Sequence, residues 1–489
     1  MRTLDEVLAA HPLPLFKPDG SLAELKPLQV EDINKLALLG RALGDLPVGY
    51  GKTAIATCVS LMIGPRSTLV LMPPILLEQW VKWLNAVPGA GRVVGYWGTP
   101  KERALLQVRG ARWVVASYGI FKNDFERLAK EMPDAMTIMD ECQNCKNYKS
   151  QMFKRLKQFS DGKPLLLMSG TIMSGPADGY AYVKLNNPEV YPRFVTFQNI
   201  HVAKFDYFDQ PEEWKNLDLL QSNLDLSRVK RTKEEVHAHL PEARYIPLEY
   251  SLAPDHMALY HKLMDEQLLE IGEGKIDATT AGKLHAASQQ IIANWAYFAD
   301  DEDLVPNLFP LIDQVLAEIG IGEPVYPGDP PRSKLIIWTN FRRTSRRVLE
   351  YINAKGVVKG KRGKPDTQAW YFSGAYGEVD SKAGIKAFME DPKCLGGVFQ
   401  PGSAGAGLNA QFVCWEQLFA ETPTTTIPFV QCCGRSDREG QLYNPNFRLA
   451  IAKGTIQQSL LKNLFTNDGL VQQASGTKTS IKDLIFPKV

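Results

Sequence analysis

The stretch Val48-Gly49-Tyr50-Gly51-Lys52-Thr53, which runs directly into the apolar helical pattern TAIATCVSLMI (53–63), decides the fold. A glycine-rich turn lets backbone N–H groups approach phosphate oxygens, and the N-terminus of the following helix adds a favourable field. In such a turn Lys52 reaches the β- and γ-phosphates and the Thr53 hydroxyl binds Mg²⁺. The full G-x-x-x-x-G-K-[ST] pattern would place glycine at position 46, where this chain has Leu46. A glycine turn that ends in Lys-Thr by chance is the alternative.

Two adjacent acids, Asp140 and Glu141, follow the apolar run MTIM (136–139). A carboxylate at the carboxyl end of a strand can hold Mg²⁺ through water, and its neighbour can orient and deprotonate an attacking water. An ordinary strand exit can also carry two acids. The phosphate loop upstream favours a nucleotide site, with Asp140 and Thr53 as metal ligands and Glu141 as the base.

Short apolar runs predict an α/β fold. In the first half, TLVLM (68–72), WVVAS (113–117), MTIMD (136–140) and LLLMS (165–169) are typical of buried strands in a parallel sheet that is covered on both faces. A polar or glycine-containing signature follows each run, at the edge of the sheet where ligands bind in such folds. The small hydroxyl residues of Ser169-Gly170-Thr171 form one of these signatures.

A second alternating region comprises KLIIWTN (334–340), QAWYFSG (368–374), GGVFQPG (396–402), VCWEQLFA (413–420) and FRLAIA (447–452). Between the two regions, residues 255–320 read as helices without strand signals, and the Gly/Pro-rich residues 319–332 read as a linker. We therefore expect two lobes of parallel sheet flanked by helices. The expected divisions are an N-terminal arm (1–24), a first lobe (25–235), a linker with a helical insertion (236–332) and a second lobe (333–489).

The second region adds a glycine-rich loop, GSAGAGLN (402–409), and the segment QCCGRSDREGQ (431–441), in which Arg435 and Arg438 are three residues apart. On a helix this spacing places both guanidinium groups on one face. Two such cations can reach a γ-phosphate as arginine fingers do. A solvated basic helix face is the alternative.

Composition limits the possible partners. With 489 residues and 44% hydrophobic content, the chain can form two or three domains with cores. The net charge is only +2, so any nucleic-acid surface must be local, as in FRRTSRR (341–347).

Seven cysteines indicate no disulfide framework, and Cys142-x-x-Cys145 lacks the second ligand pair of a structural zinc site. The N-terminus has no signal-peptide pattern and no run is long enough to span a bilayer, so we expect a cytoplasmic protein.

Taken in order, these motifs resemble superfamily two helicases, and within them the Swi/Snf-type double-stranded DNA translocases, from about residue 25 to 460. The matching segments are LKPLQVEDINKLA (25–37) for the Q motif, LVLMPPILLEQWVKWL (69–84) for motif Ia, VVASYGIF (114–121) for Ib, DECQNCKN (140–147) for the DEAH box, SGTIMSGPADGYAYVKLNNP (169–188) for the SGTP region, KLIIWTNF (334–341) for motif IV, GSAGAGLN for V and QCCGRSDREGQ for VI. The segment SRVKRTKEEVHAHLPEARYIPLEYSLAPDHMALY (227–260) resembles the family's lobe-joining region.

The resemblance implies two RecA-like lobes that bind ATP and Mg²⁺ and act on DNA. The catalytic residues implied are Lys52, Asp140, Glu141, Gln143, Arg435 and Arg438. The nucleotide-binding residues implied are Gln29, Gly49, Tyr50, Gly51, Lys52, Thr53, Gly405 and Gln431, with Gln29 reading the adenine. The nucleic-acid-binding residues implied are Pro73, Ser117, Tyr118, Ser169, Thr171, Asn340, Arg342, Arg343 and Ser403.

We therefore expect an ATP-dependent DNA translocase or helicase, acting on duplex or branched DNA in replication, recombination or repair. The alternatives are an ATP-driven remodeller that displaces proteins without strand separation, and an RNA-directed helicase. A monomer is expected because both halves of the ATP site lie in one chain. The compact size is typical of members that phage or mobile-element genomes carry.

The sequence departs from the family pattern at defined positions. Cys142 and Gln143 replace the Ala-His of the DEAH form, and Leu46 replaces the first glycine of the phosphate loop. Between motifs V and VI, Glu421-Thr422-Pro423 replaces the family's Asp…Trp-Asn-Pro. This last change concerns the coupling to the DNA backbone and leaves the ATPase motifs intact.

Overall fold

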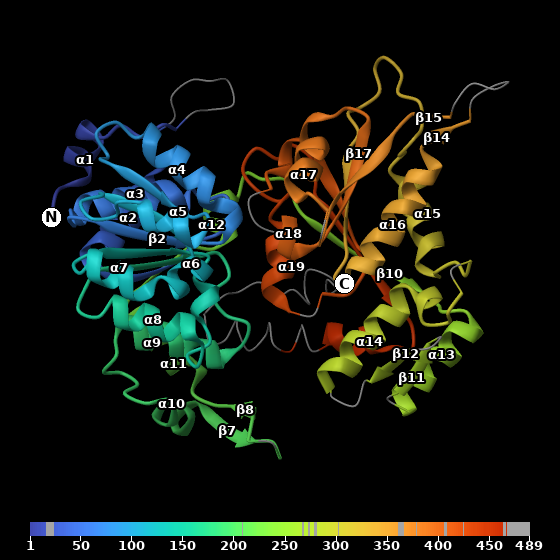
Figure 1. Cartoon of the computed structure of the whole chain (residues 1–489), viewed down its shortest axis with the longest axis horizontal. Helices are drawn as coiled ribbons and strands as arrows, with labels where there is room; N and C mark the ends of the chain where they lie inside the picture. The colour runs from blue at the N-terminus through green and yellow to red at the C-terminus, as the bar shows by residue number, and fades with distance from the viewer. Residues whose placement is uncertain are drawn as a thin grey trace. The chain divides into compact units, whose positions relative to one another are not determined.

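The chain forms two compact units, one built on Met1–Ala238 and the other on His239–Asp468 (Figure 1). The computed structural model describes residues 1–15, 24–207, 209–266, 268–271, 274–277, 281–301, 303–359, 366–377, 379–404, 408–423, 425–462 and 466.

The first unit contains a seven-stranded parallel sheet with the order β3-β4-β2-β5-β6-β1-β9. Its strands are β1 (Arg41–Asp45), β2 (Thr68–Met72), β3 (Val93–Tyr96), β4 (Trp113–Ser117), β5 (Met136–Asp140), β6 (Leu165–Ser169) and β9 (Arg228–Lys230). The four runs predicted as strands in this half are confirmed as β2, β4, β5 and β6.

Both faces of this sheet are buried, as its continuous apolar runs predict. In β2, Leu69 and Leu71 belong to one hydrophobic cluster, whereas Val70 and Met72 belong to another. Successive strand residues point to opposite faces, so the two clusters are the cores above and below the sheet. The helices of this unit are α1 (Leu4–Ala10), α2 (Pro27–Leu39), α3 (Lys52–Ile63), α4 (Leu77–Ala86), α5 (Pro100–Leu105), α6 (Tyr118–Asn123), α7 (Phe125–Glu131), α8 (Gln151–Phe159), α9 (Gly179–Asn186), α10 (Phe194–His201), α11 (Leu217–Asp225) and α12 (Lys233–His237).

Short elements complete the first unit. They are the 3-10 turns η1 (Pro74–Leu76), η2 (Cys142–Cys145) and η3 (Pro176–Asp178), and the hairpin of β7 (Val202–Phe205) and β8 (Pro211–Trp214).

Part of the segment expected to be an N-terminal arm belongs to the core of the first unit. Helix α1 packs against α3, and Leu4 and Val7 are buried in the same cluster as Val70. Thr3 and Glu6 form a capping box that fixes the start of α1. The helix is amphipathic, and burial of its apolar face explains why it docks instead of extending from the lobe.

The second unit contains a six-stranded parallel sheet with the order β10-β19-β18-β13-β17-β16. Its strands are β10 (Arg244–Tyr250), β13 (Lys334–Trp338), β16 (Tyr371–Ala375), β17 (Cys394–Phe399), β18 (Cys414–Phe419) and β19 (Asn446–Ala452). Its other elements are α13 (Pro254–Glu266), α14 (Ala281–Ala293), η4 (Trp295–Tyr297), α15 (Leu308–Glu318), α16 (Arg342–Lys355), α17 (Ser381–Glu390), α18 (Pro401–Ala404), η5 (Ala410–Phe412), α19 (Thr426–Cys433), and the hairpins β11 (Leu268–Ile271) with β12 (Gly274–Asp277) and β14 (Val357–Val358) with β15 (Thr367–Gln368).

The segment 236–332, expected to be linker and helices, differs from that expectation. Strand β10 pairs in parallel with β19 over its whole length, and α15 joins the hydrophobic cluster of β13. The β11–β12 hairpin follows α13, where the sequence suggested a continuous helix. Pro247 makes the β10 segment unlike a strand in the sequence. The sheet tolerates this proline because β10 is an edge strand.

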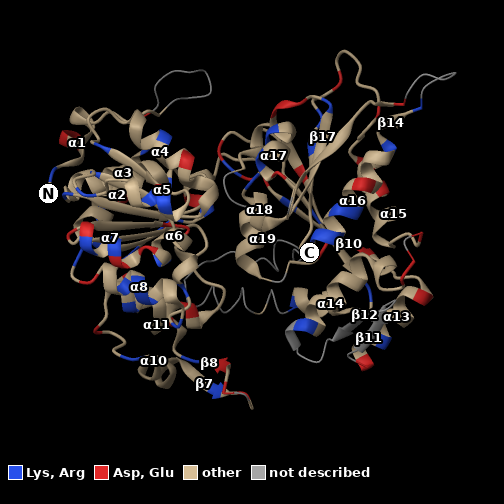
Figure 2. Cartoon of the chain, viewed as in Figure 1, with Lys and Arg blue, Asp and Glu red and all other residues tan. Residues whose placement is uncertain are grey.

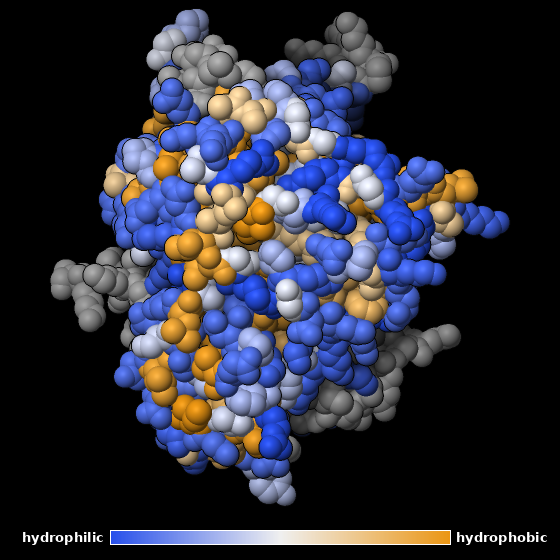
Figure 3. Space-filling view, turned by 90° about the vertical axis from the view of Figure 1, so that its left-hand side faces the viewer, coloured by the Kyte–Doolittle hydropathy of each residue, from blue (hydrophilic) through white to orange (hydrophobic). Residues whose placement is uncertain are grey.

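The face shown in Figure 3 is mostly hydrophilic, with hydrophobic side chains in narrow strips. Within the described part of the chain, no helix combines the length and the apolar character needed to cross a membrane.

Candidate functional site

The glycine turn lies directly before helix α3, as its sequence predicts, and it follows strand β1, which was not predicted. Gly49 and Gly51 have φ angles of +82° and +81°, which glycine adopts without steric cost. A Cβ atom at position 51 would also lie 2.7 Å from the Nε2 atom of Gln29. Helix α3 then begins at Lys52, so its N-terminal N–H groups face the turn.

Lys52 and Leu46 hold this turn closed. The Lys52 Nζ atom donates to the carbonyl oxygens of Leu46 and Pro47, both at 3.1 Å. The Leu46 side chain is fully buried, and its N–H donates to the Ser169 carbonyl at 2.9 Å. Leucine at the position of the first motif glycine therefore anchors the loop in the core. Thr53 follows Lys52 in the first turn of α3 and is half-buried.

Helix α2 braces the turn from the side. Gln29 accepts from the Lys26 N–H at 2.7 Å and donates to the Tyr50 carbonyl at 2.8 Å. The Tyr50 hydroxyl donates to Asp32 at 2.9 Å, and Arg231 donates to the same carboxylate. Burial, followed by the hydrogen bond to Asp32, raises the pKa of Tyr50.

The acidic pair lies at the carboxyl end of β5. Asp140 is buried, and its Oδ2 and Oδ1 atoms accept from the Trp80 indole N–H at 2.9 Å and from the Glu141 N–H at 3.1 Å. Burial, followed by the charge of Glu141, raises the pKa of Asp140 to about 6, while Lys52 opposes the shift. Glu141 has a φ angle of +55°, a left-handed conformation that is uncommon for a residue with a Cβ atom. Such outliers cluster at functional sites.

A hydrogen-bond chain connects Glu141 to the Ser-Gly-Thr segment. Gln143 donates to the Glu141 carboxylate at 2.9 Å, and the Ser169 hydroxyl donates to Gln143 at 2.7 Å. The Thr171 N–H donates to the Ser169 hydroxyl at 3.0 Å. The Thr171 hydroxyl is itself buried without a hydrogen-bond partner among the described residues. The structure thus brings Glu141 and Gln143 together with Ser169 and Thr171, although Gln143 and Ser169 are 26 positions apart in the sequence.

The other predicted nucleic-acid contacts of the first unit have structural roles in this conformation. Ser117 is buried and accepts from the Ile120 N–H at 3.4 Å to cap α6. The Tyr118 hydroxyl donates to the carbonyl oxygens of Asp140 and Glu141. Pro73 is half-buried and directly precedes the turn η1 as its N-cap residue.

In the second unit, Glu421 organises the corresponding edge of the sheet. Its buried carboxylate accepts from the N–H groups of Asn340 and Phe341, the latter at 3.1 Å, and from the Thr344 hydroxyl at 2.8 Å. Burial raises the pKa of Glu421 to about 7. Asn340 also accepts from Gln400 at 2.8 Å through its carbonyl oxygen.

A pocket of about 330 Å³ opens at this edge, where the carboxyl ends of β13, β17 and β18 meet. The pocket brings together Asn340 and Ser403, two residues predicted from the sequence to bind nucleic acid. The remaining lining residues are Trp338, Gln400, Pro401, Gly402, Phe419, Glu421, Pro423, Pro428, Phe429 and Cys432. Gly405 lies outside the described residues.

The prediction that Arg435 and Arg438 share a helix face is wrong. Helix α19 ends at Cys433, and both arginines lie in the turn that follows. Gln441 holds this turn by donating to the Ser436 carbonyl at 3.1 Å, a non-helical arrangement that the spacing of the arginines does not reveal.

The turn nevertheless places the two arginines against residues 408–409. Arg435 donates to the carbonyl oxygens of Gln431 and Leu408, at 2.9 and 3.4 Å, and Arg438 donates to Asn409 at 2.7 Å. Burial, followed by the charge of Arg435, lowers the pKa of Arg438 to about 10.

Arg342 and Arg343 are exposed at the start of α16, the helix whose ribbon carries the blue of Lys and Arg in Figure 2. The Arg343 guanidinium lies 3.5 Å from the centre of the Tyr297 ring, so a cation–π contact orients it.

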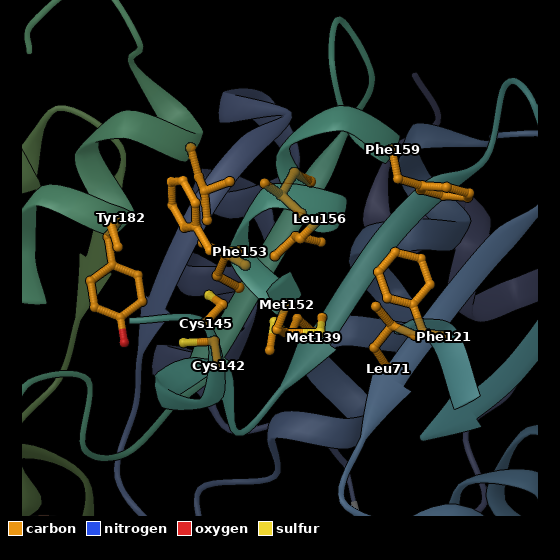
Figure 4. Close-up of a cluster of buried hydrophobic side chains, with 14 of the residues drawn as sticks. Leu71, Phe121, Met139, Cys142, Cys145, Met152, Phe153, Leu156, Phe159 and Tyr182 are labelled. Atoms are coloured by element: carbon orange, nitrogen blue, oxygen red, sulfur yellow. The ribbon is translucent and has the colours of Figure 1, made fainter. Parts of the chain in front are cut away.

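The Cys142 and Cys145 thiols lie in a hydrophobic cluster with Met139, Met152 and Phe153 (Figure 4). Burial raises the pKa of Cys145 to about 12. These thiols therefore act as small apolar side chains of the core.

Two further site residues were missed. Trp80 was matched only as part of the motif Ia segment, and no local pattern indicates its contact with Asp140, which is 60 positions away. Glu421 was noted only as a departure from the family pattern, but a carboxylate directly after a buried strand is the same signal that identified Asp140.

A glycine turn between a parallel strand and a helix, with paired acids at the end of a nearby strand, is the arrangement of P-loop nucleotide-binding proteins. The sequence profile of the SNF2-related domain matches residues 26–294, more than half of the chain. The protein therefore belongs to the SNF2-related domain family.

Individual relatives are distant. The chain is 27% identical over 263 residues to "Chromodomain-helicase-DNA-binding protein 1-like" of Danio rerio, covering 50% of this chain and 25% of that protein. It is 23% identical over 467 residues to "Uncharacterized ATP-dependent helicase MG018" of Mycoplasma genitalium, covering 92% of this chain and 41% of that protein. The chain thus spans a quarter to two fifths of the length of these relatives. Among solved structures, it is similar to the Sulfolobus solfataricus SWI2/SNF2 ATPase core in complex with double-stranded DNA, with 18% identity, 90% coverage of both chains and a TM-score of 0.40.

Proposed function

We propose that this protein is a DNA-stimulated ATPase that translocates along duplex or branched DNA. The observation that carries the proposal is the hydrogen-bond chain from Glu141 through Gln143 to Ser169 and Thr171. It connects the residue proposed to activate water with a segment proposed to contact nucleic acid. One set of side chains can thereby link hydrolysis to movement.

The residues of the first unit fit ATP and Mg²⁺. The backbone N–H groups of the turn at Gly49 and Gly51, together with Lys52, would hold the phosphates. Thr53 and Asp140 offer oxygen ligands of the kind that Mg²⁺ prefers, and the bound ion would neutralise phosphate charge. Gln29 would bind the adenine.

We propose that Glu141 orients the attacking water and accepts its proton. Gln143 donates to the Oε2 atom of Glu141 and so fixes how this carboxylate is turned toward the water. In the second unit, we propose that Gln431, Arg435 and Arg438, together with Gly405 of the glycine-rich loop, bind the nucleotide phosphates.

The nucleic-acid contacts are proposed to be with the phosphate backbone and not with base edges. In the second unit Asn340, Ser403, Arg342 and Arg343 would supply them. In the first unit Pro73, Ser117, Tyr118, Ser169 and Thr171 would do so after a change of conformation, because several of these side chains are buried. Monomeric action is part of this proposal.

The names of the relatives support DNA as the partner. One is "ATP-dependent DNA helicase DDM1" of Arabidopsis thaliana, 21% identical over 280 residues. Another is "Chromatin-remodeling ATPase INO80" of Drosophila melanogaster, 25% identical over 224 residues. The second name favours an alternative function, in which the motor displaces bound proteins from DNA without separating its strands.

The test is ATP hydrolysis by the wild type and by Lys52→Ala, without nucleic acid and with single-stranded DNA, duplex DNA, a four-way junction or RNA. We expect strong stimulation by duplex or junction DNA that Lys52→Ala abolishes. A preference for RNA would assign the protein to RNA-directed helicases. Hydrolysis that no nucleic acid changes would refute the motor.

Two displacement assays separate the alternatives. Release of a triplex-forming strand reports translocation on duplex DNA, and release of a paired strand from a fork reports unwinding. Triplex release without unwinding, together with eviction of a bound protein, favours the remodeller. Unwinding of the fork favours the helicase.

A further inference from the structure

Trp80 makes a polar contact that its packing does not require. The residue is 2% exposed on α4, and its ring lies in the hydrophobic cluster that contains Ile55, Val59 and Met72. Its indole N–H donates to the Oδ2 atom of Asp140 at 2.9 Å. A phenylalanine at this position would supply most of the apolar packing. The indole N–H group is therefore the feature of Trp80 that a phenylalanine would lack and that interacts with Asp140.

The contact fixes how the Asp140 carboxylate is turned. Oδ2 accepts from Trp80 and Oδ1 accepts from the Glu141 N–H, so the plane of the carboxylate is set by one donor on each oxygen. Each oxygen has a second lone pair available for a water of the metal shell. Donors of this kind orient carboxylates at metal sites and are worth about 10- to 100-fold in metal affinity.

Trp80 lies close in the chain to Pro73, one of the residues proposed to contact nucleic acid. Helix α4 begins directly after the turn η1, which follows Pro73 at the end of β2. Strand β2 pairs with β5, the strand that ends at Asp140. Only the first three residues of α4 therefore separate the η1 turn from the indole that contacts Asp140.

We propose that Trp80 is a positioning residue that holds the Asp140 carboxylate in the orientation that binds the nucleotide-associated Mg²⁺. This inference rests on the proposed function, because it takes Asp140 as a metal-holding residue. It assigns a specific role to the motif Ia helix in the ATP site.

The test uses Mn²⁺ as the probe and does not depend on catalysis. Mn²⁺ is titrated into the full chain with saturating ADP, and free Mn²⁺ is read from its electron paramagnetic resonance signal. Trp80→Phe should weaken Mn²⁺ binding about tenfold. Trp113→Phe is the matched control, because Trp113 is also buried and its indole donates to the Ala90 carbonyl at 2.9 Å, away from Asp140. This control should bind Mn²⁺ as the wild type does.

A second variant removes the N–H and keeps the shape of the ring. Replacement of Trp80 by β-(3-benzothienyl)alanine, in which sulfur stands for the indole N–H, guards against a fold defect of Trp80→Phe. In an Asp140→Asn background, Trp80→Phe should cause no further loss, because the two residues act through one contact.

The outcomes separate the inference from the proposed function. Mn²⁺ affinity unchanged in both Trp80 variants, or lowered equally in Trp113→Phe, would overturn the positioning role and leave the ATPase proposal intact. A wild type that binds no Mn²⁺ with ADP and hydrolyses no ATP would overturn both.

Discussion

At the residue scale, position 51 shows why glycine is needed in the phosphate loop. Its φ angle of +81° is strained for other residues, and a Cβ atom there would meet Gln29. Gly64, at the other end of α3, has a φ angle of +71° and open space around it. Alanine substitutions at the two positions should therefore share the backbone strain, and only the substitution at position 51 should add a steric clash in the site.

We predict that Gly51→Ala and Gly64→Ala both lower the free energy of unfolding by about 1 kcal/mol, the usual cost of a left-handed alanine. Only Gly51→Ala should also weaken ATP binding, by more than about tenfold, because its methyl group displaces the Gln29 amide from Tyr50. Denaturant unfolding and titration with a fluorescent ATP analogue give the two readouts. Equal ATP affinities in the two variants would show that the loop tolerates a side chain at position 51.

Gln143 replaces the histidine of the family's DEAH form, and the structure shows that its amide can serve both neighbours. One end donates to Glu141 and the other accepts from Ser169. A side chain without these groups would remove the acceptor of the buried Ser169 O–H group and one donor to the Glu141 carboxylate.

We predict that Gln143→Leu lowers kcat for DNA-stimulated hydrolysis by about tenfold or more, as expected for the loss of a hydrogen bond to a charged group. The Kd for ATP should stay close to that of the wild type, because Gln143 does not belong to the phosphate turn. Gln158→Leu, on the exposed face of α8, is the matched control. A Gln143→Leu variant with normal kcat would remove the basis for the proposed link between hydrolysis and movement.

At the scale of elements, the sequence predicts the strands that have continuous aliphatic runs and misses those whose pattern is interrupted. Strand β2 and its neighbours were found because continuous aliphatic runs are typical of a sheet buried on both faces. Strand β1 (Arg41–Asp45) is short, polar at both ends and contains Gly44, so its pattern is too weak to recognise. Strand β10 was not predicted because Pro247 suggests a linker. These three cases differ in local pattern, although all three strands lie in parallel sheets.

The candidate site divides in the same way. The glycine turn and the acidic pair are local patterns, and the sequence correctly placed the turn before a helix and the acids at the end of a strand. The contact of Trp80 with Asp140 joins residues 60 positions apart, and no local pattern encodes it. Arg435 and Arg438 were assigned to a helix because spacing alone cannot show that Gln441 stabilises a turn.

Glu421 gives an element-scale prediction, because it fixes the start of α16 to the end of β18. Its pKa of about 7 exceeds the ordinary value of 4.5, so the folded state binds more protons than the unfolded state between these values. The stability that this group contributes is fully present below about pH 4.5 and is lost as pH rises through about 7.

We predict that Glu421→Gln removes up to about 3 kcal/mol of this pH dependence between pH 5 and 8, since one pKa unit corresponds to about 1.4 kcal/mol. The readout is the slope of the free energy of unfolding against pH, followed by circular dichroism in denaturant. Glu350→Gln, an exposed acid on α16, should keep the wild-type slope. Identical slopes in all three proteins would show that Glu421 titrates near its ordinary pKa.

At the scale of the whole molecule, the low net charge of +2 constrains how DNA can be held. Nonspecific attraction by the chain as a whole is weak, so affinity has to come from a few local cations that displace counterions from the phosphates. Arg342 and Arg343 are the exposed pair that the sequence and structure both place beside Asn340, whose loop faces the pocket of the second unit.

We therefore predict that the double variant Arg342→Ala/Arg343→Ala weakens duplex binding to a similar extent for every sequence. It should also reduce the slope of log K against log salt by about 1.8, which is about 0.9 for each phosphate that is no longer neutralised. The measurement is fluorescence anisotropy of labelled duplexes across a series of salt concentrations. Lys386→Ala, an exposed cation on α17 that lies near Glu390, should leave the slope unchanged. If the double variant kept the wild-type slope, the start of α16 would not touch the phosphate backbone. The pocket residues Asn340 and Ser403 would then have to hold DNA through neutral hydrogen bonds, which a salt series would reveal as binding that barely weakens with salt.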